Sequence, residues 1–193
     1  MAHAQGAGGI KAAVRAGIRS IEHGIFLDDE AIDLMLERGT WLVPTLAAPR
    51  AVLTAVAAGA SLPAAVVEKA RAVQAVHDES VTRAVEAGVK VAMGTDSGVG
   101  PHGDNLVELG LMAGCGMTAE QAWHATTLSA AELLGVADSL GSLEPGKRAD
   151  VVVLDGDAGD LTGLSARVRE VWRDGELVAV GGATVERGVV PPR

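Results

Sequence analysis

The sequence predicts an α/β fold in which parallel strands alternate with crossover helices. Three times along the chain, a helical stretch ends at a glycine and is followed by a short apolar strand with polar residues at its far end. Such repeats predict parallel strands, because two parallel neighbours cannot be joined by a tight turn and need a crossover helix. The chain has 193 residues, of which 48% are hydrophobic, so it can bury a core and is not a disordered protein.

Each repeat pairs one helix with one strand. Gly17, Gly39 and Gly88 follow the three predicted helices, where a helix end needs the left-handed backbone that glycine adopts at little cost. Asp28 is the predicted N-cap of the second helix. Pro44 predicts a bend in the second strand because it removes a ladder donor. In the first repeat the helix covers residues 10–16 and the strand 18–23. In the second they cover residues 29–38 and 41–46, and in the third 66–87 and 89–96.

The pattern changes after residue 103, where the three repeats end. A helix is expected over residues 104–114. Thr118-x-x-Gln121 and Ser129-x-x-Glu132 have the form of capping boxes, which predicts that each opens a short helix.

The last part of the chain is β-like. A strand is expected over residues 149–154, and Asp174-Gly175 between apolar runs predicts a hairpin. We therefore divide the chain into an α/β part at residues 1–137 and a small β-subdomain with a tail at residues 138–193.

The composition excludes several classes of function. There are 16 Lys and Arg against 25 Asp and Glu, a net charge of −9, and only 2% of the residues are aromatic. Nucleic-acid-binding surfaces need basic and aromatic side chains, so no nucleic-acid partner is expected. Cys115 is the only cysteine, which excludes a disulfide within the chain and indicates a reducing compartment. No signal peptide is visible and no apolar run reaches the roughly 20 residues of a membrane helix. We expect a soluble, cytoplasmic protein.

Three side chains that can bind a metal lie at or just past the ends of predicted strands. They are His3, His23 and Asp96. In parallel α/β folds, functional side chains collect at the carboxyl ends of the strands. Two imidazoles and a carboxylate suit a divalent ion such as zinc and leave one coordination position for water, which is a hydrolase arrangement. His102, on the loop after Asp96, is a candidate for substrate contact.

Each candidate also has a structural interpretation, because a polar residue at a strand end often makes only a local hydrogen bond. His102 is equally typical of a solvated loop. His77 and His124 lie within helical stretches, far from strand ends, so we interpret both as structural, and Cys115 is assigned no role. No glycine-rich strand-to-helix signature supports a third reading, a phosphate-binding module.

Three segments together resemble the C-terminal half of an amidohydrolase-superfamily enzyme. The branch is the imidazolonepropionase-like one, which includes Xaa-Pro dipeptidase-like proteins. Ala-His-Ala-Gln-Gly and Ile-Glu-His-Gly resemble the ends of barrel strands 5 and 6, and Met-Gly-Thr-Asp-Ser-Gly resembles the end of strand 8. Gly-Ser-Leu-Glu-Pro-Gly-Lys-Arg-Ala-Asp-Val-Val-Val-Leu, at residues 141–154, resembles the link into the small β-subdomain.

The resemblance implies a partial (β/α)8 TIM-type barrel, equivalent to strands 5–8, with one or two divalent metals, usually zinc. It implies hydrolysis of C–N bonds in a small amide, cyclic amide or dipeptide. His3 and His23 would be metal ligands. Asp96 would be both ligand and general base, taking a proton from the bound water and passing it to the leaving amine.

The sequence departs from the family pattern in one respect. Members of the family begin with a His-x-His pair on strand 1, which this sequence lacks, and the strand before His3 is almost absent. We therefore expect a fragment that is weakly active or inactive without an N-terminal half. The alternative is a non-catalytic half-barrel that forms a homo-oligomer or pairs with another chain.

Overall fold

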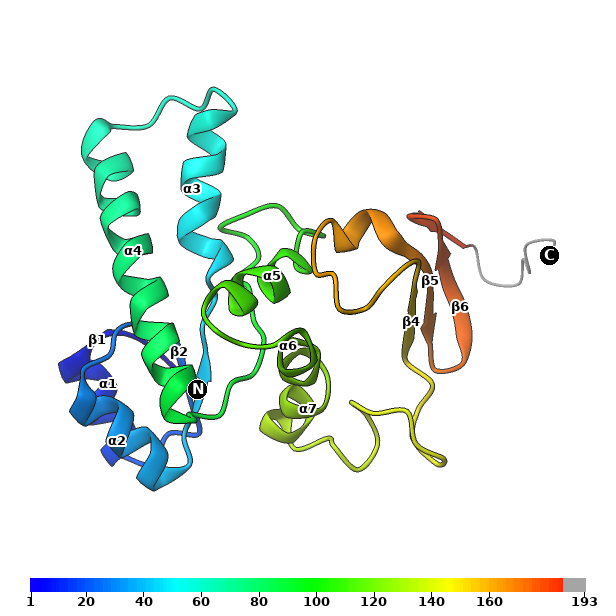
Figure 1. Ribbon diagram of the computed structural model, residues 1–193, viewed down its shortest axis with the longest axis horizontal. Helices are drawn as coiled ribbons and strands as arrows, with labels where there is room; N and C mark the ends of the chain where they lie inside the picture. The colour runs from blue at the N-terminus through cyan, green and yellow to red at the C-terminus, as the bar shows by residue number, and fades with distance from the viewer. Residues whose placement is uncertain (186–193) are drawn as a thin grey trace.

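A computed structural model describes residues 1–185, which form a layered α/β part followed by a smaller β part (Figure 1). The bounds of the elements, in chain order, are β1 (Ala2–Gly6), α1 (Ala7–Arg15), β2 (Ser20–Phe26), α2 (Asp29–Arg38), β3 (Trp41–Val43), α3 (Ala47–Ala57), α4 (Ala64–Ala87), α5 (Val107–Gly114), α6 (Ala119–Thr126), α7 (Leu128–Leu134), β4 (Val151–Leu154), a 3-10 turn (Leu164–Arg167), β5 (Val168–Arg173), β6 (Glu176–Val180) and β7 (Ala183–Thr184).

The first sheet is parallel and has the strand order β1-β2-β3. Helix α1 connects β1 to β2, and α2 connects β2 to β3, so the predicted crossover helices are confirmed. His3 pairs with Glu22, and Ser20 pairs with Trp41. Because the strands run in one direction, their carboxyl ends meet at the same edge of the sheet.

The predicted helix ends are also confirmed. The Asp28 carboxylate accepts a hydrogen bond from the Ala31 amide at 2.8 Å and so caps α2. Gly39 and Gly88 have the left-handed backbone at the ends of α2 and α4. These contacts satisfy backbone groups that a helix end leaves without partners.

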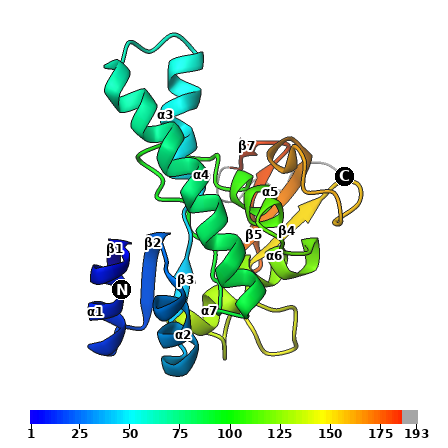
Figure 2. The same ribbon diagram turned by 60° about the vertical axis from the view of Figure 1, so that its left-hand side comes forward.

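Helices α3 and α4 form a hairpin that extends beyond the sheet (Figure 2). The second half of α4 packs against β2, and its buried residues there include His77 and Ser80. An ion pair of 2.6 Å between Arg50 and Asp78 joins α3 to α4. The hairpin is therefore anchored to the sheet through α4.

One of the two predicted capping boxes is confirmed and the other is wrong. Thr118 and Gln121 make both reciprocal hydrogen bonds at the start of α6. Helix α7 instead begins at Leu128, directly after α6, so Ser129 already lies inside its first turn. The buried Ser129 hydroxyl pairs with the His124 ring at 2.8 Å rather than with a helix amide.

The second sheet is antiparallel, with the strand order β4-β5-β6-β7. The hairpin predicted at Asp174-Gly175 is confirmed. Both residues have a positive φ, 57° and 79°, as the tight turn between two antiparallel strands requires. The division into residues 1–137 and 138–193 stays a prediction, and residues 186–193 of its second part lie outside the described chain.

Two expectations for the parallel sheet are wrong. The strand expected over residues 89–96 is reduced to a single bridge between Leu42 and Val91. Its backbone leaves the sheet because the Met93 amide donates to Ala125 of α6 instead of a neighbouring strand. His3, expected after a nearly absent strand, lies within β1, because this short segment pairs with β2 from Ala2 to Ala4 and again at Gly6. The described strands form no closed ring, so the partial (β/α)8 barrel is not confirmed.

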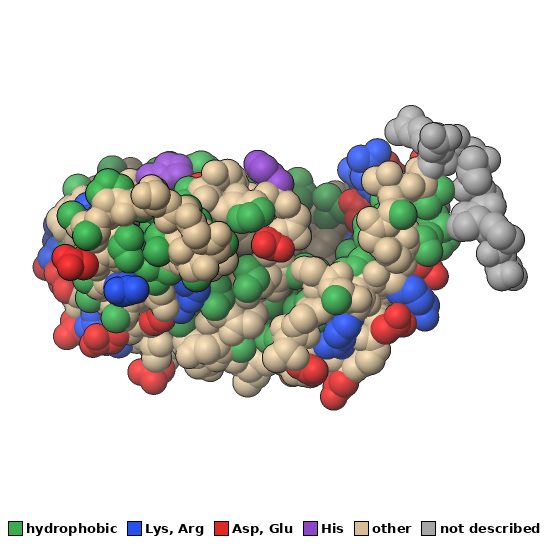
Figure 3. Space-filling model, turned by 90° about the horizontal axis from the view of Figure 1, so that it is seen from above, with side chains coloured by type: hydrophobic (Ala, Val, Ile, Leu, Met, Phe, Trp, Pro, Cys, Tyr) green, Lys and Arg blue, Asp and Glu red, His purple; other side chains and the backbone are tan. Residues whose placement is uncertain are grey.

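The core lies between the parallel sheet and the helices that cover it. The side chains of Ile10, Ile21, Leu42 and Val81 are fully buried and come from α1, β2, β3 and α4. On the face seen in Figure 3, acidic and basic side chains are interspersed rather than separated by sign. Within residues 1–185, no helix is both long and apolar enough to cross a membrane.

Candidate functional site

Two of the predicted site residues, His3 and His23, are in direct contact. They lie on the adjacent parallel strands β1 and β2. Nδ1 of His3 is 2.8 Å from Nε2 of His23, and the two ring centroids are 5.0 Å apart. His3 is exposed and His23 is buried, so the pair has one face toward solvent. Two imidazole nitrogens therefore point at the same small volume at the edge of the sheet.

The backbone at the strand ends is unusual. The described residues include four non-glycine residues with a positive φ, and three of them are His23, Thr45 and Asp96, with φ of 77°, 52° and 55°. His23 lies in β2, Thr45 lies just after β3, and Asp96 follows the bridge at Val91. Left-handed non-glycine residues are unfavourable and cluster at functional sites. Their coincidence here indicates a site at this edge of the sheet.

Thr45 is a site residue that the sequence did not indicate. Its hydroxyl oxygen Oγ1 lies 2.7 Å from Nδ1 of His23, and both groups are buried. When Nδ1 of His23 donates this hydrogen bond, Nε2 is left without a proton and faces His3. A histidine that binds a metal shows this arrangement, with its second ring nitrogen bonded to an oxygen that fixes the ring. Only the bend predicted at Pro44 pointed to this part of the chain.

The environment of His23 favours the neutral ring. Burial lowers the pKa of His23, the Asp96 carboxylate opposes this effect, and the charge of His3 adds to it. A neutral imidazole is the form that binds a metal ion.

The histidine pair fits a divalent metal as a partial ligand set. Two imidazole nitrogens that share a tetrahedral zinc ion, each about 2.1 Å from it, lie about 3.4 Å apart. The observed 2.8 Å is a hydrogen-bonding distance, about 0.6 Å shorter, so the two rings must separate slightly to share such an ion. Residues 1–185 contain no group of three or more His, Cys, Asp or Glu side chains close enough to hold a metal. The structure thus brings the two imidazoles together, and Asp96 as third ligand and base stays a prediction.

A cavity of about 770 Å³ lies beside Asp96. It is bounded by α3, by the loop after Asp96 and by α5, and its lining is largely small and apolar. Thr95 and Ser97, which flank Asp96 in the sequence, both line it. His102 is exposed on the same loop, and its neighbour Pro101 lines the cavity. The substrate contact expected of His102 stays a prediction.

Glu108 is a buried residue of α5 that binds the backbone at the start of α3. It is fully buried, and its two carboxylate oxygens accept hydrogen bonds from the amides of Leu46 and Ala47 at 2.6 and 2.8 Å. Burial raises the pKa of Glu108 to about 7, against the effect of these amides. Glu108 therefore fixes the segment that follows Thr45. The sequence pattern did not indicate this role, because a glutamate early in a helix is typically exposed.

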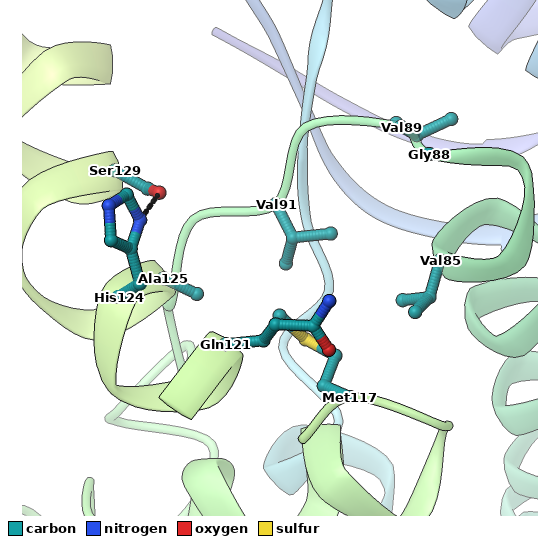
Figure 4. A pocket seen from close by; sticks show the side chains of 9 residues that line it. All are labelled: Val85, Gly88, Val89, Val91, Met117, Gln121, His124, Ala125 and Ser129. Carbon is teal, nitrogen blue, oxygen red and sulfur yellow. Dashed lines mark hydrogen bonds between the residues drawn. The ribbon is translucent and has the colours of Figure 1, made fainter. Parts of the chain in front are cut away.

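A second, smaller cavity of about 270 Å³ lies away from the histidine pair (Figure 4). It is lined by Gly88, Val89 and Val91, at the opposite end of the segment that leads to Asp96. His124 lies at its margin, with its ring bonded to Ser129. This contact joins α6 to α7 and agrees with the structural role predicted for His124.

The fold is that of an α/β protein in which two imidazoles from adjacent parallel strands meet. The amidohydrolase family matches residues 1–183. The chain therefore belongs to the amidohydrolase family.

Several relatives support this assignment. Ochratoxinase from Aspergillus niger is 33% identical over 183 residues, which cover 91% of this chain and 37% of ochratoxinase. Imidazolonepropionase from Geobacillus kaustophilus is 41% identical over 76 residues, 38% of this chain and 18% of that protein. The crystal structure of a Xaa-Pro dipeptidase with methionine bound in its active site is 43% identical, with a TM-score of 0.83 over 91% of this chain and 43% of the dipeptidase. The chain thus spans about two fifths of the lengths of ochratoxinase and the dipeptidase.

Proposed function

We propose that the chain forms part of a metal-dependent amidohydrolase that cleaves a C–N bond in a small amide or dipeptide. The approach of a His3 nitrogen to a His23 nitrogen, 2.8 Å apart across the adjacent parallel strands β1 and β2, is the observation that carries the proposal. Family membership supports the reaction class, since the relatives include a dipeptidase and an ochratoxinase.

In this proposal, His3 and His23 hold a divalent ion, with zinc preferred because two imidazoles suit it. When bound, such an ion supplies a Lewis acid for the scissile carbonyl and a nucleophilic water at neutral pH. Thr45 keeps the His23 ring in the tautomer that presents Nε2. The Asp96 carboxylate accepts a proton from the attacking water and delivers it to the nitrogen of the leaving amine.

The substrate would enter the cavity beside Asp96. Its largely small and apolar lining, which also includes Arg50 and Asp104, suits a hydrocarbon side chain, while Thr95 and Ser97 offer hydroxyls near the reacting carbonyl. His102, on the same loop, would contact the substrate at the cavity mouth.

We further propose that residues outside this chain complete the site. Two imidazoles hold a metal ion less firmly than the three or four protein ligands of ordinary zinc sites. A His-x-His pair from an N-terminal half would supply the remainder, and the length of the relatives is consistent with such a half.

The test is hydrolysis of Xaa-Pro dipeptides and N-acyl amino acids by the zinc-loaded chain. The chain is assayed alone and after mixing with the His-x-His-bearing half of a family relative. We expect turnover only in the mixture, and its loss in the Asp96→Asn variant. Equal turnover by the mixed parent and Asp96→Asn would remove Asp96 from the mechanism, and robust turnover by the chain alone would refute the need for a second half.

A second candidate is a non-catalytic half-barrel that associates with itself. It is favoured by the lack of a three-ligand cluster within residues 1–185. Size-exclusion chromatography with metal analysis separates the two. A stable homodimer without stoichiometric metal supports this second candidate, whereas bound zinc supports the hydrolase.

A further inference from the structure

The middle of β2 has a backbone that a strand does not ordinarily adopt. His23 and Gly24 are consecutive left-handed residues, with φ of 77° and 61°. This conformation is unfavourable for histidine, because its Cβ then lies too close to the following carbonyl oxygen. Contacts from elsewhere in the fold must therefore hold it.

Two buried residues of α4 make those contacts. Nε2 of His77 lies 2.8 Å from the carbonyl oxygen of His23, and the Ser80 hydroxyl donates to the carbonyl of Gly24 at 2.9 Å. Because a carbonyl only accepts, Nε2 of His77 carries the proton and donates it. The Ser80 hydroxyl also accepts from the amide of Leu27 at 2.9 Å. His77 and Ser80 are three residues apart, so they project from the same face of the helix.

The chemistry of His77 indicates a role beyond packing. Its side chain is fully buried, yet its second ring nitrogen, Nδ1, has no hydrogen-bond partner among the described residues. A buried polar atom without a partner costs stability, so an apolar side chain of similar size would serve a purely structural position better. An apolar side chain at position 77 would lose the hydrogen bond to the carbonyl of His23, so this bond is what the histidine adds.

The other side of His23 faces the candidate metal site. Its ring is bonded through Nδ1 to Thr45 and points Nε2 at His3. The backbone of His23 is thus held from α4, and its ring is held from the segment after β3. A change at the carbonyl alters φ and ψ of His23 and so displaces the ring.

We propose that His77 and Ser80 are positioning residues, which fix the left-handed backbone of His23 and Gly24 and thereby aim the His23 imidazole at His3. The inference rests on the proposed function, in which that imidazole holds a divalent ion. Neither positioning residue touches the ion or the substrate.

The first test is Co²⁺ titration of the full chain, followed by visible absorption, together with urea unfolding. His77→Leu keeps the size of the side chain but removes the donor, and we expect it to weaken Co²⁺ binding about 10-fold or more. His77→Gln retains an N–H donor and is expected to restore most of the loss. Val81→Ala, a cavity variant on the same helix, should lower the urea midpoint and leave Co²⁺ affinity unchanged. Parent-like Co²⁺ binding by His77→Leu, or an equal loss in Val81→Ala, overturns the proposal.

The second test needs no metal and separates this inference from the proposed function. The ¹⁵N signals of the His23 ring are followed by NMR in the metal-free chain. We expect them to move in His77→Leu, to return in His77→Gln and to stay in place in Val81→Ala. If the parent binds no Co²⁺, the assignment of His3 and His23 as a metal-holding pair of this chain fails. Unchanged His23 signals in His77→Leu would independently overturn the positioning role. If His77→Leu does not fold, both tests are made on Ser80→Ala, which removes only a hydroxyl. We expect Ser80→Ala to weaken Co²⁺ binding and to move the ¹⁵N signals of the His23 ring.

Discussion

Replacing Glu108 by glutamine is expected to change how the stability of the protein depends on pH. The carboxyl group is fully buried, and burial raises its pKa from the ordinary 4.5 to about 7. Between these two values the folded protein binds more protons at this site than the unfolded chain does. The contribution of Glu108 to the free energy of unfolding is therefore fully present below pH 4.5 and is lost as the pH rises through 7.

The size of the effect follows from the same two pKa values. Their difference corresponds to about 3 kcal/mol across the window, at 1.36 kcal/mol for each pKa unit. Glutamine does not ionise, so the Glu108→Gln variant lacks this loss. At low pH the variant is expected to be less stable than the parent by about 1 kcal/mol, because its amide accepts only one of the two backbone hydrogen bonds.

The assay is urea unfolding of parent and variant at a series of pH values from 4 to 8.5, followed by circular dichroism. The free energy of unfolding of Glu108→Gln minus that of the parent should rise by about 3 kcal/mol across the series. Exposed Glu79 is the matched control, and Glu79→Gln should give a flat difference. A flat difference for Glu108→Gln as well would show that the buried carboxyl group does not titrate in this window, and the reasoning from burial would be wrong.

Three further predictions each concern one residue, and the first has a second glycine as its matched control. Gly24→Ala should lower the free energy of unfolding by about 1–3 kcal/mol, because the residue has φ of 61° and its Cβ would lie 2.6 Å from a leucine of β3. Gly8→Ala, within α1 with nothing within 4 Å, should instead raise it by up to about 1 kcal/mol, and chemical denaturation distinguishes the two signs. Asp28→Ala should cost about 1 kcal/mol through loss of the α2 cap, and an unchanged midpoint in thermal unfolding would contradict this. Thr45→Val removes the oxygen bonded to His23 and should weaken zinc binding about 10-fold, as measured by calorimetry.

The parts of the fold that local chemistry controls could be predicted from the sequence. The N-cap of α2 at Asp28 and its end at Gly39 depend on one residue each, as does the hairpin at Asp174-Gly175. The parallel arrangement followed from the helix–glycine–strand repeat. The expectation that His3 and His23 lie close together needed only parallel neighbouring strands, although His3 lies within β1 rather than after it.

The parts that depend on contacts distant in sequence could not be predicted. The segment at residues 89–96 has the composition of a strand, yet Met93 bonds to α6 and only Val91 pairs with β3. In the sequence, Glu108 has the pattern of an exposed helix residue. It is buried because α5 packs against the start of α3. The helical position of His77 predicts only a structural role, and the contact of its ring with the carbonyl of His23 depends on the packing of α4 against β2.

The direct test of the account is equilibrium dialysis of the full chain against zinc. If two facing imidazoles hold a shared ion, His3→Ala and His23→Ala should each weaken zinc binding at least about 10-fold relative to the parent. His124→Ala, which removes a histidine bonded to Ser129 elsewhere in the fold, should bind zinc as the parent does. Equal zinc binding by all three variants would contradict the assignment of this edge of the sheet as a metal site.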